Sequence, residues 1–371
     1  MTDWPFDPSL LRRHPDIEAT NLHAVDATDR LLLDTAAEAI AADPTGLVVI
    51  GDNYGALTLG AAARFGATDI RTHQDLLTGE QALAANARRL GLTGSFRSCP
   101  LEPKLVSGAR IVLLQAPRSL TELVQLSQLV AHHSHPSVRL LVGGRVKYLT
   151  HAVNEVLAAR FGQVQAGLAR QKSRVITATA PRADAEPVEF PQRQWHADLE
   201  LWVCAQGGAF AGTAVDIGTR RLVQSLDRLP SGRPALDLGC GTGVLAALLA
   251  RQGRQVLASD RSAAACASAA ATAAANGLIV AVSRDDALSQ QPAASAELIL
   301  CNPPFHLGGA VHAGAASKLF AGAQRVLRTG GQLWTVFNNH LGYRAQLERL
   351  IGPTELIHRD TKFSVTASTR R

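Results

Sequence analysis

The chain has 371 residues, a formal net charge of +6 and an isoelectric point near 9.4. Its 46% hydrophobic and 18% charged residues describe a soluble protein with enough apolar residues for two domains of ordinary size. No apolar run reaches the roughly 18 residues that a membrane-spanning helix needs, so we expect no membrane partner.

The positive charge comes almost entirely from arginine, because the chain contains only five lysines. A mutational bias toward arginine and alanine codons would produce this composition. Adaptation to a polyanionic partner such as RNA or DNA would produce it as well. Charge alone therefore does not choose between the two explanations.

The five cysteines are widely spaced and form no C-x-x-C pair, which argues against a disulfide framework and against a zinc site. We therefore expect no bound metal. The N-terminus has acidic residues where a secretory leader would have a basic and then an apolar segment, so we expect no signal peptide. These features predict a cytoplasmic protein, which we expect to be a monomer.

A weak internal repeat runs along the whole chain. Ala-Val-Asp occurs at 24–26 and again at 214–216, and the apolar run with its following proline at 111–117 aligns with 298–304. Across all matched segments the spacing stays between 186 and 190 residues. Such a constant spacing predicts a tandem duplication with small loop insertions.

The duplication predicts two domains, at 1–182 and 195–371, with a linker at 183–194. The linker is rich in proline and acidic residues, which is typical of a connecting segment. The stretch 195–204 alternates between apolar and polar residues like a β-strand. We expect it to begin an extra β layer of the second domain.

Within each unit, short apolar runs alternate with alanine-rich helical stretches. This order predicts buried parallel strands with right-handed crossover helices, so each unit should be a doubly wound, Rossmann-like α/β domain with a mostly parallel sheet. In the second unit the expected strands are 235–238, 255–259, 297–301, 331–337 and 362–367. The expected helices include 243–251 and 262–276, and Gly277 should end the latter.

A glycine-rich turn follows the first expected strand of the second unit. Gly239, Gly241 and Gly243 let the backbone approach a ligand without Cβ clashes, and the next helix offers free N–H groups at its positive end. Asp260 ends the next strand, where its carboxylate can accept both hydroxyls of a ribose. Asp286 follows the third strand region, where it can accept an adenine amino group. The pattern favours S-adenosylmethionine as the cofactor.

The expected cofactor contacts are Asp216, Asp237, Gly239, Cys240, Gly241, Thr242, Gly243, Asp260, Arg261, Asp286, Ala287 and Asn302. We expect Cys240 to be a small filler and not a nucleophile. A dinucleotide-dependent dehydrogenase can carry a similar turn. Asp237 directly before the glycines favours a methyl donor, and no separate hydride-transfer site is apparent.

The quartet Asn302, Pro303, Pro304 and Phe305 closes a later apolar strand and is suited to holding a planar amino group. An exocyclic amine is a poor nucleophile, because its lone pair is delocalised into the ring. The Asn302 side-chain oxygen and the Pro303 carbonyl can fix its two hydrogens, and consecutive prolines hold that carbonyl still. Phe305 can stack on the base. We therefore predict a catalytic site that acts by orienting the substrate amine. A proline-terminated strand followed by a phenylalanine of the core would give the same sequence pattern.

These motifs resemble the class I S-adenosylmethionine-dependent methyltransferases that carry N-P-P-[FY], and more narrowly the duplicated ribosomal RNA guanine-N2 methyltransferases of the RsmC/RlmG group. The resemblance covers nearly the whole chain and includes the duplicated layout, the cofactor turn and the quartet. Residues 143–147 and 161–165 look closer to the large-subunit member. The resemblance implies that the first copy has lost catalysis and helps to fold the protein and to bind RNA.

The first copy departs from the catalytic pattern, as the resemblance implies. Asn53 and Tyr54 replace the open glycine turn, and residues 115–118 replace the quartet. Candidate phosphate contacts are Arg118, Arg145 and Lys147 in the first copy and, more weakly, Arg220, Arg221 and Arg344 in the second. Ion-paired or solvated surface explains all six equally well. Residues 210–212 read Phe-Ala-Gly where the family has Phe-Ser-Arg, which weakens substrate docking through that loop.

The sequence therefore predicts methyl transfer from S-adenosylmethionine to the N2 amine of a guanine in ribosomal RNA, with the large subunit favoured over the small one. The partner would be ribosomal RNA or a ribosomal subunit. Two alternatives stay open. The quartet could orient a protein glutamine amide or adenine N6, and a chain of two degenerate domains could be a non-catalytic RNA-binding assembly factor.

Overall fold

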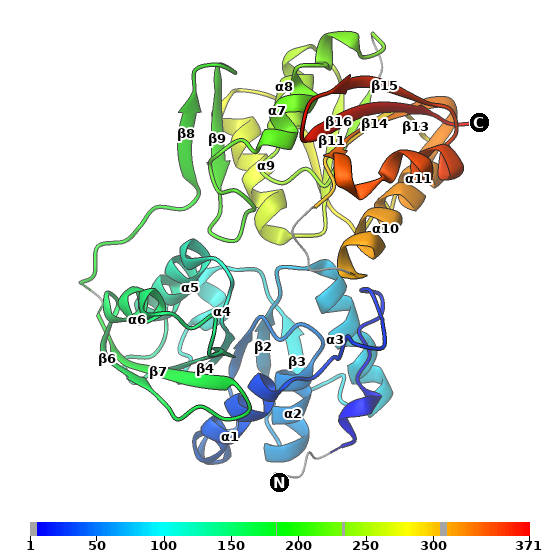
Figure 1. Ribbon diagram of the computed structural model, residues 1–371. Coiled ribbons are helices and arrows are strands. Elements are labelled where there is room, and N and C mark those ends of the chain that lie inside the picture. Colours follow the sequence, from blue (N-terminus) through cyan, green and yellow to red (C-terminus); the bar gives the residue numbers. More distant parts are fainter. Residues whose placement is uncertain (1–5, 183, 232–233, 305–309) are drawn as a thin grey trace. The chain divides into compact units, whose positions relative to one another are not determined.

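The computed structural model describes residues 6–182, 184–231, 234–304 and 310–371, with the backbone alone for 310–313. The chain forms two compact units, Met1–Phe190 and Pro191–Arg371 (Figure 1). Each unit has its own sheet and its own hydrophobic cores.

The sheet of the first unit consists of β1 (Val48–Ile50), β2 (Ile70–His73), β3 (Phe96–Ser98), β4 (Ile111–Gln115), β5 (Arg139–Arg145), β6 (Phe161–Ala166) and β7 (Ser173–Pro181). The strand order is β3-β2-β1-β4-β5-β7-β6. Among these described strands, β7 runs antiparallel to both of its neighbours and the other pairs are parallel.

The sheet of the second unit consists of β10 (Ala235–Leu238), β11 (Val256–Asp260), β12 (Ala281–Arg284), β13 (Ala296–Cys301), β14 (Leu327–Asn338), β15 (Thr354–Arg359) and β16 (Phe363–Thr369). Its order, β12-β11-β10-β13-β14-β16-β15, repeats that of the first sheet strand for strand. Here β16 is the strand that pairs antiparallel with its neighbours in the described part. The shared order confirms two tandem Rossmann-like domains with mostly parallel sheets.

Helices connect the strands and cover the sheets. The first unit has α1 (Ala27–Ala42), α2 (Ala56–Phe65), α3 (Leu77–Leu90), α4 (Pro103–Val106), α5 (Leu120–His133) and α6 (His151–Ala158). The second unit has α7 (Ile217–Val223), α8 (Val244–Arg251), α9 (Ala263–Ala275), α10 (Ala310–Val326) and α11 (Tyr343–Leu350). Short 3-10 turns are η1 (Pro8–Leu10), η2 (Leu226–Arg228) and η3 (Asn339–Leu341).

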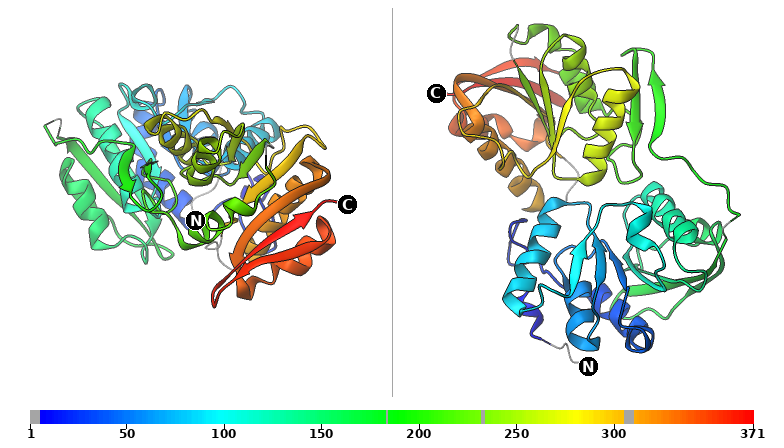
Figure 2. Two further views of the ribbon diagram at one scale, coloured as in Figure 1. Left: turned by 90° about the horizontal axis from the view of Figure 1, so that it is seen from above. Right: turned by 180° about the vertical axis from the view of Figure 1, so that it is seen from behind.

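Buried apolar residues on both faces explain why the central strands read as continuous hydrophobic runs. In β13, Leu298 and Leu300 pack into the core under α8, whereas Ile299 and Cys301 pack into the core under α10 and α11. All four are fully buried, and each of the three aliphatic side chains contributes about 1.5–3 kcal/mol when it leaves water. The helices on the two faces of each sheet are visible in Figures 1 and 2.

A β-hairpin precedes the second sheet. It consists of β8 (Gln192–His196) and β9 (Leu201–Ala205), which pair antiparallel. The single strand expected at 195–204 is therefore wrong, because the chain turns back on itself between the two strands. The linker expected at 183–194 is also too long, since β8 already begins at Gln192.

Polar residues of α9 hold this hairpin in place. Ser268, Thr272 and Asn276 are spaced four residues apart and therefore share one face of the helix. Their side-chain oxygens accept backbone N–H groups at and beyond β9, from Gln206, Cys204 and Trp202, at 2.9, 2.9 and 3.0 Å. These side chains of α9 thus accept the backbone hydrogen bonds of β9 that a neighbouring strand would otherwise accept.

The expected strands of the second sheet are present with small shifts in their ends. The two edge strands of this sheet, β12 and β15, are not among the expected strands. β12 is only four residues long and β15 is mostly exposed, so neither has an apolar run. Within the described residues, no helix is both long and apolar enough to cross a membrane. The same residues contain no cluster of three or more His, Cys, Asp or Glu that could hold a metal ion.

Candidate active site

The glycine turn and the Asn302 quartet follow neighbouring strands. β10 and β13 pair in parallel with Leu238 opposite Cys301, so Gly239 and Asn302 are the next residues at the same edge of the sheet. β10 pairs with β11 on its other side, so the strand order reverses at this point. Ligands of doubly wound sheets bind at such a switch point, outside the carboxyl ends of the strands. The candidate site lies there.

The glycine turn faces open space. A Cβ added at Gly239 or Gly241 would meet no heavy atom of the described residues within 4 Å. A Cβ added at Gly243 would instead lie 2.8 Å from Ala269, because α8 begins here and packs closely on α9. Two glycines therefore leave room above the turn, and the third allows two helices to approach each other.

Asp260, the last residue of β11, connects the turn to the next loop. Its Oδ2 accepts the N–H of Gly241 at 3.1 Å, and its Oδ1 accepts the N–H of Ser262 at 2.9 Å. The carboxylate thus holds two backbone segments of the edge in place. A ribose contact at Asp260 stays a prediction.

Asp237 lies beneath the turn. Its Oδ2 accepts the N–H of Ala246 in α8 at 3.0 Å, while its Oδ1 is buried without a hydrogen-bond partner among the described residues. Burial, helped by the nearby charge of Asp260, raises the pKa of Asp237 to about 7. A buried carboxylate oxygen without a donor is a place where a positively charged group of a ligand would be favourable.

Asp286 faces a lysine that the sequence reasoning missed. Its Oδ2 forms an ion pair with Lys318 of α10, and its side chain is only 9% exposed. Its neighbour Asp285 is structural, because its two oxygens accept the hydroxyl of Ser289 at 2.5 Å and the N–H of Gln290 at 3.0 Å. Nothing in the sequence around Lys318 signals this pairing, which depends on how α10 crosses the sheet.

The remaining predicted cofactor contacts lie at the same edge. Ala287 has a positive φ of 53°, and a Cβ added at Gly322 of α10 would overlap its carbonyl oxygen, so that carbonyl is directed at α10. Cys240 and Thr242 are buried within the turn, and Arg261 follows β11. Burial raises the pKa of the Cys240 thiol, which keeps it protonated and unsuited to act as a nucleophile.

Asn302 is held by the start of α7. Its Nδ2 lies 3.3 and 3.1 Å from the two carboxylate oxygens of Asp216 and 3.0 Å from the Thr219 hydroxyl oxygen. An amide nitrogen only donates, so these three acceptors determine which end of the side chain faces α7. The Asn302 Oδ1 is left without a hydrogen-bond partner among the described residues. The sequence reasoning missed Thr219, although a threonine three residues after a helix-capping aspartate is a recognisable signal.

Asp216 has structural partners of its own. Its Oδ1 accepts the N–H groups of Gly218 at 2.8 Å and Thr219 at 3.3 Å, which caps α7. Its Oδ2 accepts the Thr219 hydroxyl at 2.5 Å. These contacts give Asp216 a positioning role toward Asn302, and a direct cofactor contact stays a prediction.

The rest of the quartet is described in part. Pro303 is buried and Pro304 is exposed, so the chain leaves the core between them. Phe305 lies outside the described residues, and its stacking role stays a prediction.

In the first unit the equivalent edge is closed by its own side chains. The Gln115 Nε2, at the end of β4, donates to the Asp29 Oδ1 at 2.5 Å. Asp29 is buried, and burial raises its pKa well above the usual range for a carboxyl group. A Cβ added at Gly51 would lie 3.5 Å from Gln115, whereas the matching Gly239 faces open space.

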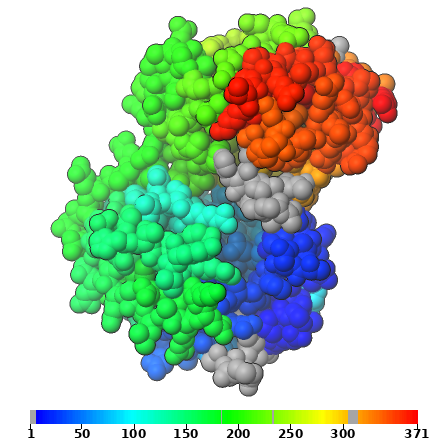
Figure 3. Space-filling model, viewed as in Figure 1, coloured from blue at the N-terminus to red at the C-terminus, as the bar shows by residue number. Residues whose placement is uncertain are grey.

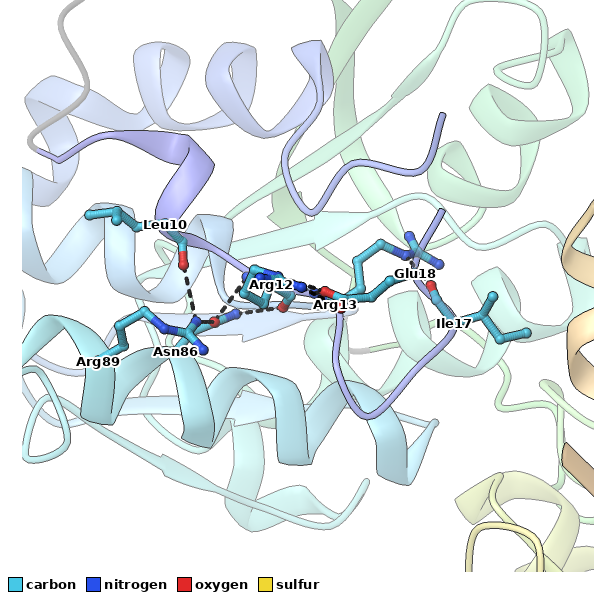
Figure 4. A network of polar contacts seen from close by, with 7 residues as sticks. All are labelled: Leu10, Arg12, Arg13, Ile17, Glu18, Asn86 and Arg89. Atoms are coloured by element: carbon cyan, nitrogen blue, oxygen red, sulfur yellow. Dashed lines mark hydrogen bonds and ion pairs between the residues drawn. The ribbon is translucent and has the colours of Figure 1, made fainter. Parts of the chain in front are cut away.

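The segment before α1 also covers the first-unit turn. The Tyr54 hydroxyl donates to the Asp16 Oδ2 at 2.7 Å, and the Arg13 guanidinium lies 4.4 Å from the centre of the Tyr54 ring. The Asn86 Nδ2 of α3 donates to the carbonyls of Arg12 at 2.9 Å and Tyr54 at 2.8 Å. Figure 4 shows how the segment lies against α3. The turn that stays open in the second unit is thus occupied by protein in the first.

A cavity of about 740 Å³ lies between this segment and the start of α1. It is lined by residues between Pro8 and Arg30, all in the first unit. Among the described residues, no predicted cofactor or quartet residue contributes to it.

The six predicted phosphate contacts fall into two groups. Those of the second unit each form an ion pair with a carboxylate of the same unit: Arg220 with Asp198, Arg221 with Asp360, and Arg344 with Glu348. Those of the first unit, Arg118, Arg145 and Lys147, form no ion pair in the part of the chain that the structure describes. The three cations of the first unit therefore keep their charge available for a partner.

Comparison with known proteins shows the family. Residues 200–367 match the Methyltransferase small domain and residues 2–182 match the RLMG N-terminal domain. The protein named ribosomal RNA large subunit methyltransferase G from Pseudomonas paraeruginosa (strain DSM 24068 / PA7) is 34% identical over 97% of both chains. Its namesake from Ectopseudomonas mendocina (strain ymp) is 35% identical over 99% of this chain and 98% of its own. The chain belongs to the ribosomal RNA large subunit methyltransferase G family.

Other relatives agree with this assignment. The protein of the same name from Streptomyces avermitilis is 33% identical and covers 99% of this chain and 98% of its own. A solved structure, the T. thermophilus 16S rRNA N2 G1207 methyltransferase (RsmC) in complex with AdoMet and guanosine, has a TM-score of 0.74. It covers 93% of this chain and 92% of its own at 22% identity, so the likeness shows a shared fold.

Proposed function

We propose that this chain transfers a methyl group from S-adenosylmethionine to the exocyclic N2 amine of a guanine in the RNA of the large ribosomal subunit. Family membership supports an rRNA methyltransferase acting on the large subunit. The observation that carries the amine assignment is Asn302. Its Nδ2 is fixed by Asp216 and Thr219, so its Oδ1 remains as an acceptor for a substrate N–H.

The turn after β10 fits the cofactor. Within the described residues, Gly239 and Gly241 leave room for a ligand, Asp260 places a carboxylate beside the turn, and the buried Asp237 Oδ1 has no donor. S-adenosylmethionine has ribose hydroxyls, an ammonium group and an electrophilic methyl on its sulfonium. The closed edge of the first unit, where Gln115 and Asp29 bind each other, offers no comparable room.

The quartet would act by orienting the amine. The Asn302 Oδ1 accepts one N–H and the Pro303 carbonyl accepts the other, which leaves the nitrogen lone pair free on the remaining side. Holding the nucleophile in this orientation lowers the entropic part of the barrier. As the new N–C bond forms, the bond between the methyl carbon and the sulfonium sulfur would break, and the sulfur would keep the electron pair and become a neutral thioether. The nitrogen then carries a positive charge, and its extra proton leaves to water. No residue of the quartet needs to act as a strong base.

The target guanine has to leave its stack to bring the amine to Asn302. Unstacking costs a few kcal/mol. A stack on Phe305 would return roughly 1–3 kcal/mol of this cost. We therefore expect a guanine in a loop or single strand to be a better substrate than one in a regular helix.

Two other functions are less well supported. Methylation of a protein glutamine or of adenine N6 would use the same quartet, but the named relatives act on ribosomal RNA. A non-catalytic assembly factor would not need an open turn in one unit only. The contrast between Gly239 and Gly51 favours an enzyme whose second unit is active.

The proposal is tested with labelled S-adenosylmethionine. The purified chain is incubated with small-subunit RNA, large-subunit RNA and the two assembled subunits, and the product RNA is digested to nucleosides. We expect label in N2-methylguanosine from the large subunit. Label in protein, in adenosine or in small-subunit RNA alone would reject the assignment.

A further inference from the structure

Asp286 lies next to Asp260 at the carboxyl edge of the second sheet. β12 pairs in parallel with β11, with Arg284 opposite Asp260, so Asp285 and Asp286 are the next residues at that edge. The Asp285 N–H donates to the Asp260 carbonyl at 2.9 Å, which joins the two strand ends. Adjacent strands lie about 4.8 Å apart. A ligand that extends from Gly239 past Asp260 would therefore reach Asp286 next.

The two oxygens of Asp286 are occupied differently. Its Oδ2 forms the ion pair with Lys318, and its Oδ1 has no hydrogen-bond donor among the described residues. In the adjacent Asp285, by contrast, both oxygens accept hydrogen bonds from the loop that follows. The Asp286 side chain is nearly buried, so an oxygen without a donor is a favourable place for an N–H of a ligand.

Lys318 belongs to a helix that holds the loop after β12. Lys318, Gly322 and Arg325 follow one another at intervals of four and three residues, so they share one face of α10. A Cβ added at Gly322 would overlap the Ala287 carbonyl oxygen, and the Arg325 Nη2 donates to the Leu288 carbonyl at 2.5 Å. The helix is among the orange segments of the second unit in Figures 1 and 3. Gly322 and Arg325 thus hold the backbone of this loop, whereas Lys318 contacts one of its side chains.

The ion pair gives the two oxygens of Asp286 different tasks. An ammonium group only donates, so the carboxylate that binds Lys318 through Oδ2 presents Oδ1 as an acceptor. A fixed acceptor suits a purine with an amino group at C6, such as adenine, because that group donates. It disfavours a purine with an oxygen at C6, such as hypoxanthine, because two acceptors would face each other. A carboxylate that is fixed before the ligand arrives also loses less entropy on binding.

We propose that Lys318 is a positioning residue for the cofactor, which fixes Asp286 so that the site selects a 6-aminopurine over a 6-oxopurine. The choice of S-adenosylmethionine as the ligand rests on the proposed function. Lys318 acts through Asp286, which follows β12, two strands away from the glycine turn after β10. It should therefore affect the affinity for the cofactor and not the rate of the methyl-transfer step.

The test is calorimetry of the full chain with S-adenosylhomocysteine and with S-inosylhomocysteine. The wild type should prefer the adenosyl compound about 10- to 100-fold, the scale of one hydrogen bond to a charged acceptor. Lys318→Met keeps the length of the side chain without its charge, and the preference should fall below about fivefold because Asp286 is free to turn. Lys318→Arg keeps the cation and should restore the preference. Arg328→Met is the matched control, since Arg328 pairs with Glu297 at the amino end of β13 and should not change either affinity.

Two further measurements separate positioning from a merely structural role. When Asp286→Asn is already present, Lys318→Met should not change the preference further, because the two side chains act as one unit. In methyl transfer, Lys318→Met should raise KM for S-adenosylmethionine about 3- to 30-fold and leave kcat within about twofold. A Lys318→Met variant that loses affinity for both compounds equally and unfolds at a lower temperature would show a structural role and overturn the inference.

The outcomes distinguish this inference from the proposed function. A wild type that binds neither compound would overturn both. A wild type that binds both compounds equally, or a Lys318→Met variant that keeps the full preference, would overturn the inference alone, provided that the wild type methylates large-subunit RNA. A preference that depends on Lys318 in a chain that methylates no RNA would support the inference and contradict the proposed function.

Discussion

The Nδ2 of Asn302 and the Oδ2 of Asp216 lie 3.1 Å apart, joining the end of β13 to the first turn of α7 across 86 residues of sequence. Asp216 is itself fixed, because it caps α7 through the N–H groups of Gly218 and Thr219. The amide of the quartet is thus oriented by residues outside the quartet. The Asn302 amide, which we assign to the substrate amine, cannot flip by 180° without losing up to three hydrogen bonds.

Asn302→Ala should abolish methyl transfer while leaving the affinity for S-adenosylmethionine within about tenfold, because the variant loses the amine acceptor and keeps the open turn. Turnover is measured with labelled cofactor and binding by calorimetry. Asn276→Ala is the matched control, since Asn276 also makes side-chain hydrogen bonds but to the hairpin strand β9. A fully active Asn302→Ala variant would contradict the role of this residue.

Thr219→Val should lower kcat about tenfold with little change in cofactor affinity, the scale expected for one hydrogen bond. The hydroxyl accepts from Asn302 at 3.0 Å and donates to Asp216, and valine keeps its shape without these contacts. Thr219→Ser should restore kcat, because it restores the hydroxyl. If the Ser variant loses as much activity as the Val variant, keeping the hydroxyl is not sufficient, and the proposed role of the Thr219 hydroxyl is contradicted.

Asp237→Asn should change how stability depends on pH. Burial raises the pKa of Asp237 to about 7 in the folded chain, with Asp260 adding to the effect, while the ordinary value is 3.8. The folded state therefore binds this proton more tightly, so the wild-type free energy of unfolding falls as pH rises from about 4 to about 7, by at most about 1.4 kcal/mol per pH unit. The cost is absent below pH 4, where both states are protonated.

The measurement is urea unfolding of the wild type and Asp237→Asn between pH 4 and 8. The difference between the two should grow in favour of the variant up to pH 7 and then stay constant. The neighbouring thiols of Cys240 and Cys301 stay neutral over this range, because burial raises the pKa of both. A difference that does not vary with pH would show that Asp237 keeps an ordinary pKa.

Gly243→Ala should destabilise the second unit more than Gly253→Ala. Both glycines have positive φ, at 76° and 81°, so both substitutions strain the backbone. Only at Gly243 would the new Cβ also collide with Ala269, which adds about 1–3 kcal/mol for overpacking where α8 meets α9. Equal losses of unfolding free energy in urea would show that the helices can move apart.

The second sheet could be predicted closely where its strands are apolar on both faces. β10 matches the predicted strand 235–238, and β13 begins one residue before the predicted 297–301. The edge strands β12 and β15 lack this signal, because one or both of their faces meet water. The sequence pattern predicts one strand where the hairpin β8–β9 lies, because the hydrogen bonds that hold this hairpin come from α9, far away in the sequence.

The duplication, the parallel α/β units and the two motifs of the second copy can be predicted from the amino-acid sequence alone. These depend on local patterns: apolar runs that must be buried, glycines that permit a tight turn, and prolines that end a strand. The partners of the charged and amide groups, in contrast, depend on the three-dimensional fold. In the folded chain Lys318 forms an ion pair with Asp286, and Asn302 donates hydrogen bonds to Asp216 and Thr219. Arg118 has no carboxylate partner among the described residues. Such pairings depend on which side chains the fold brings within a few ångströms, and spacing along the chain does not record that.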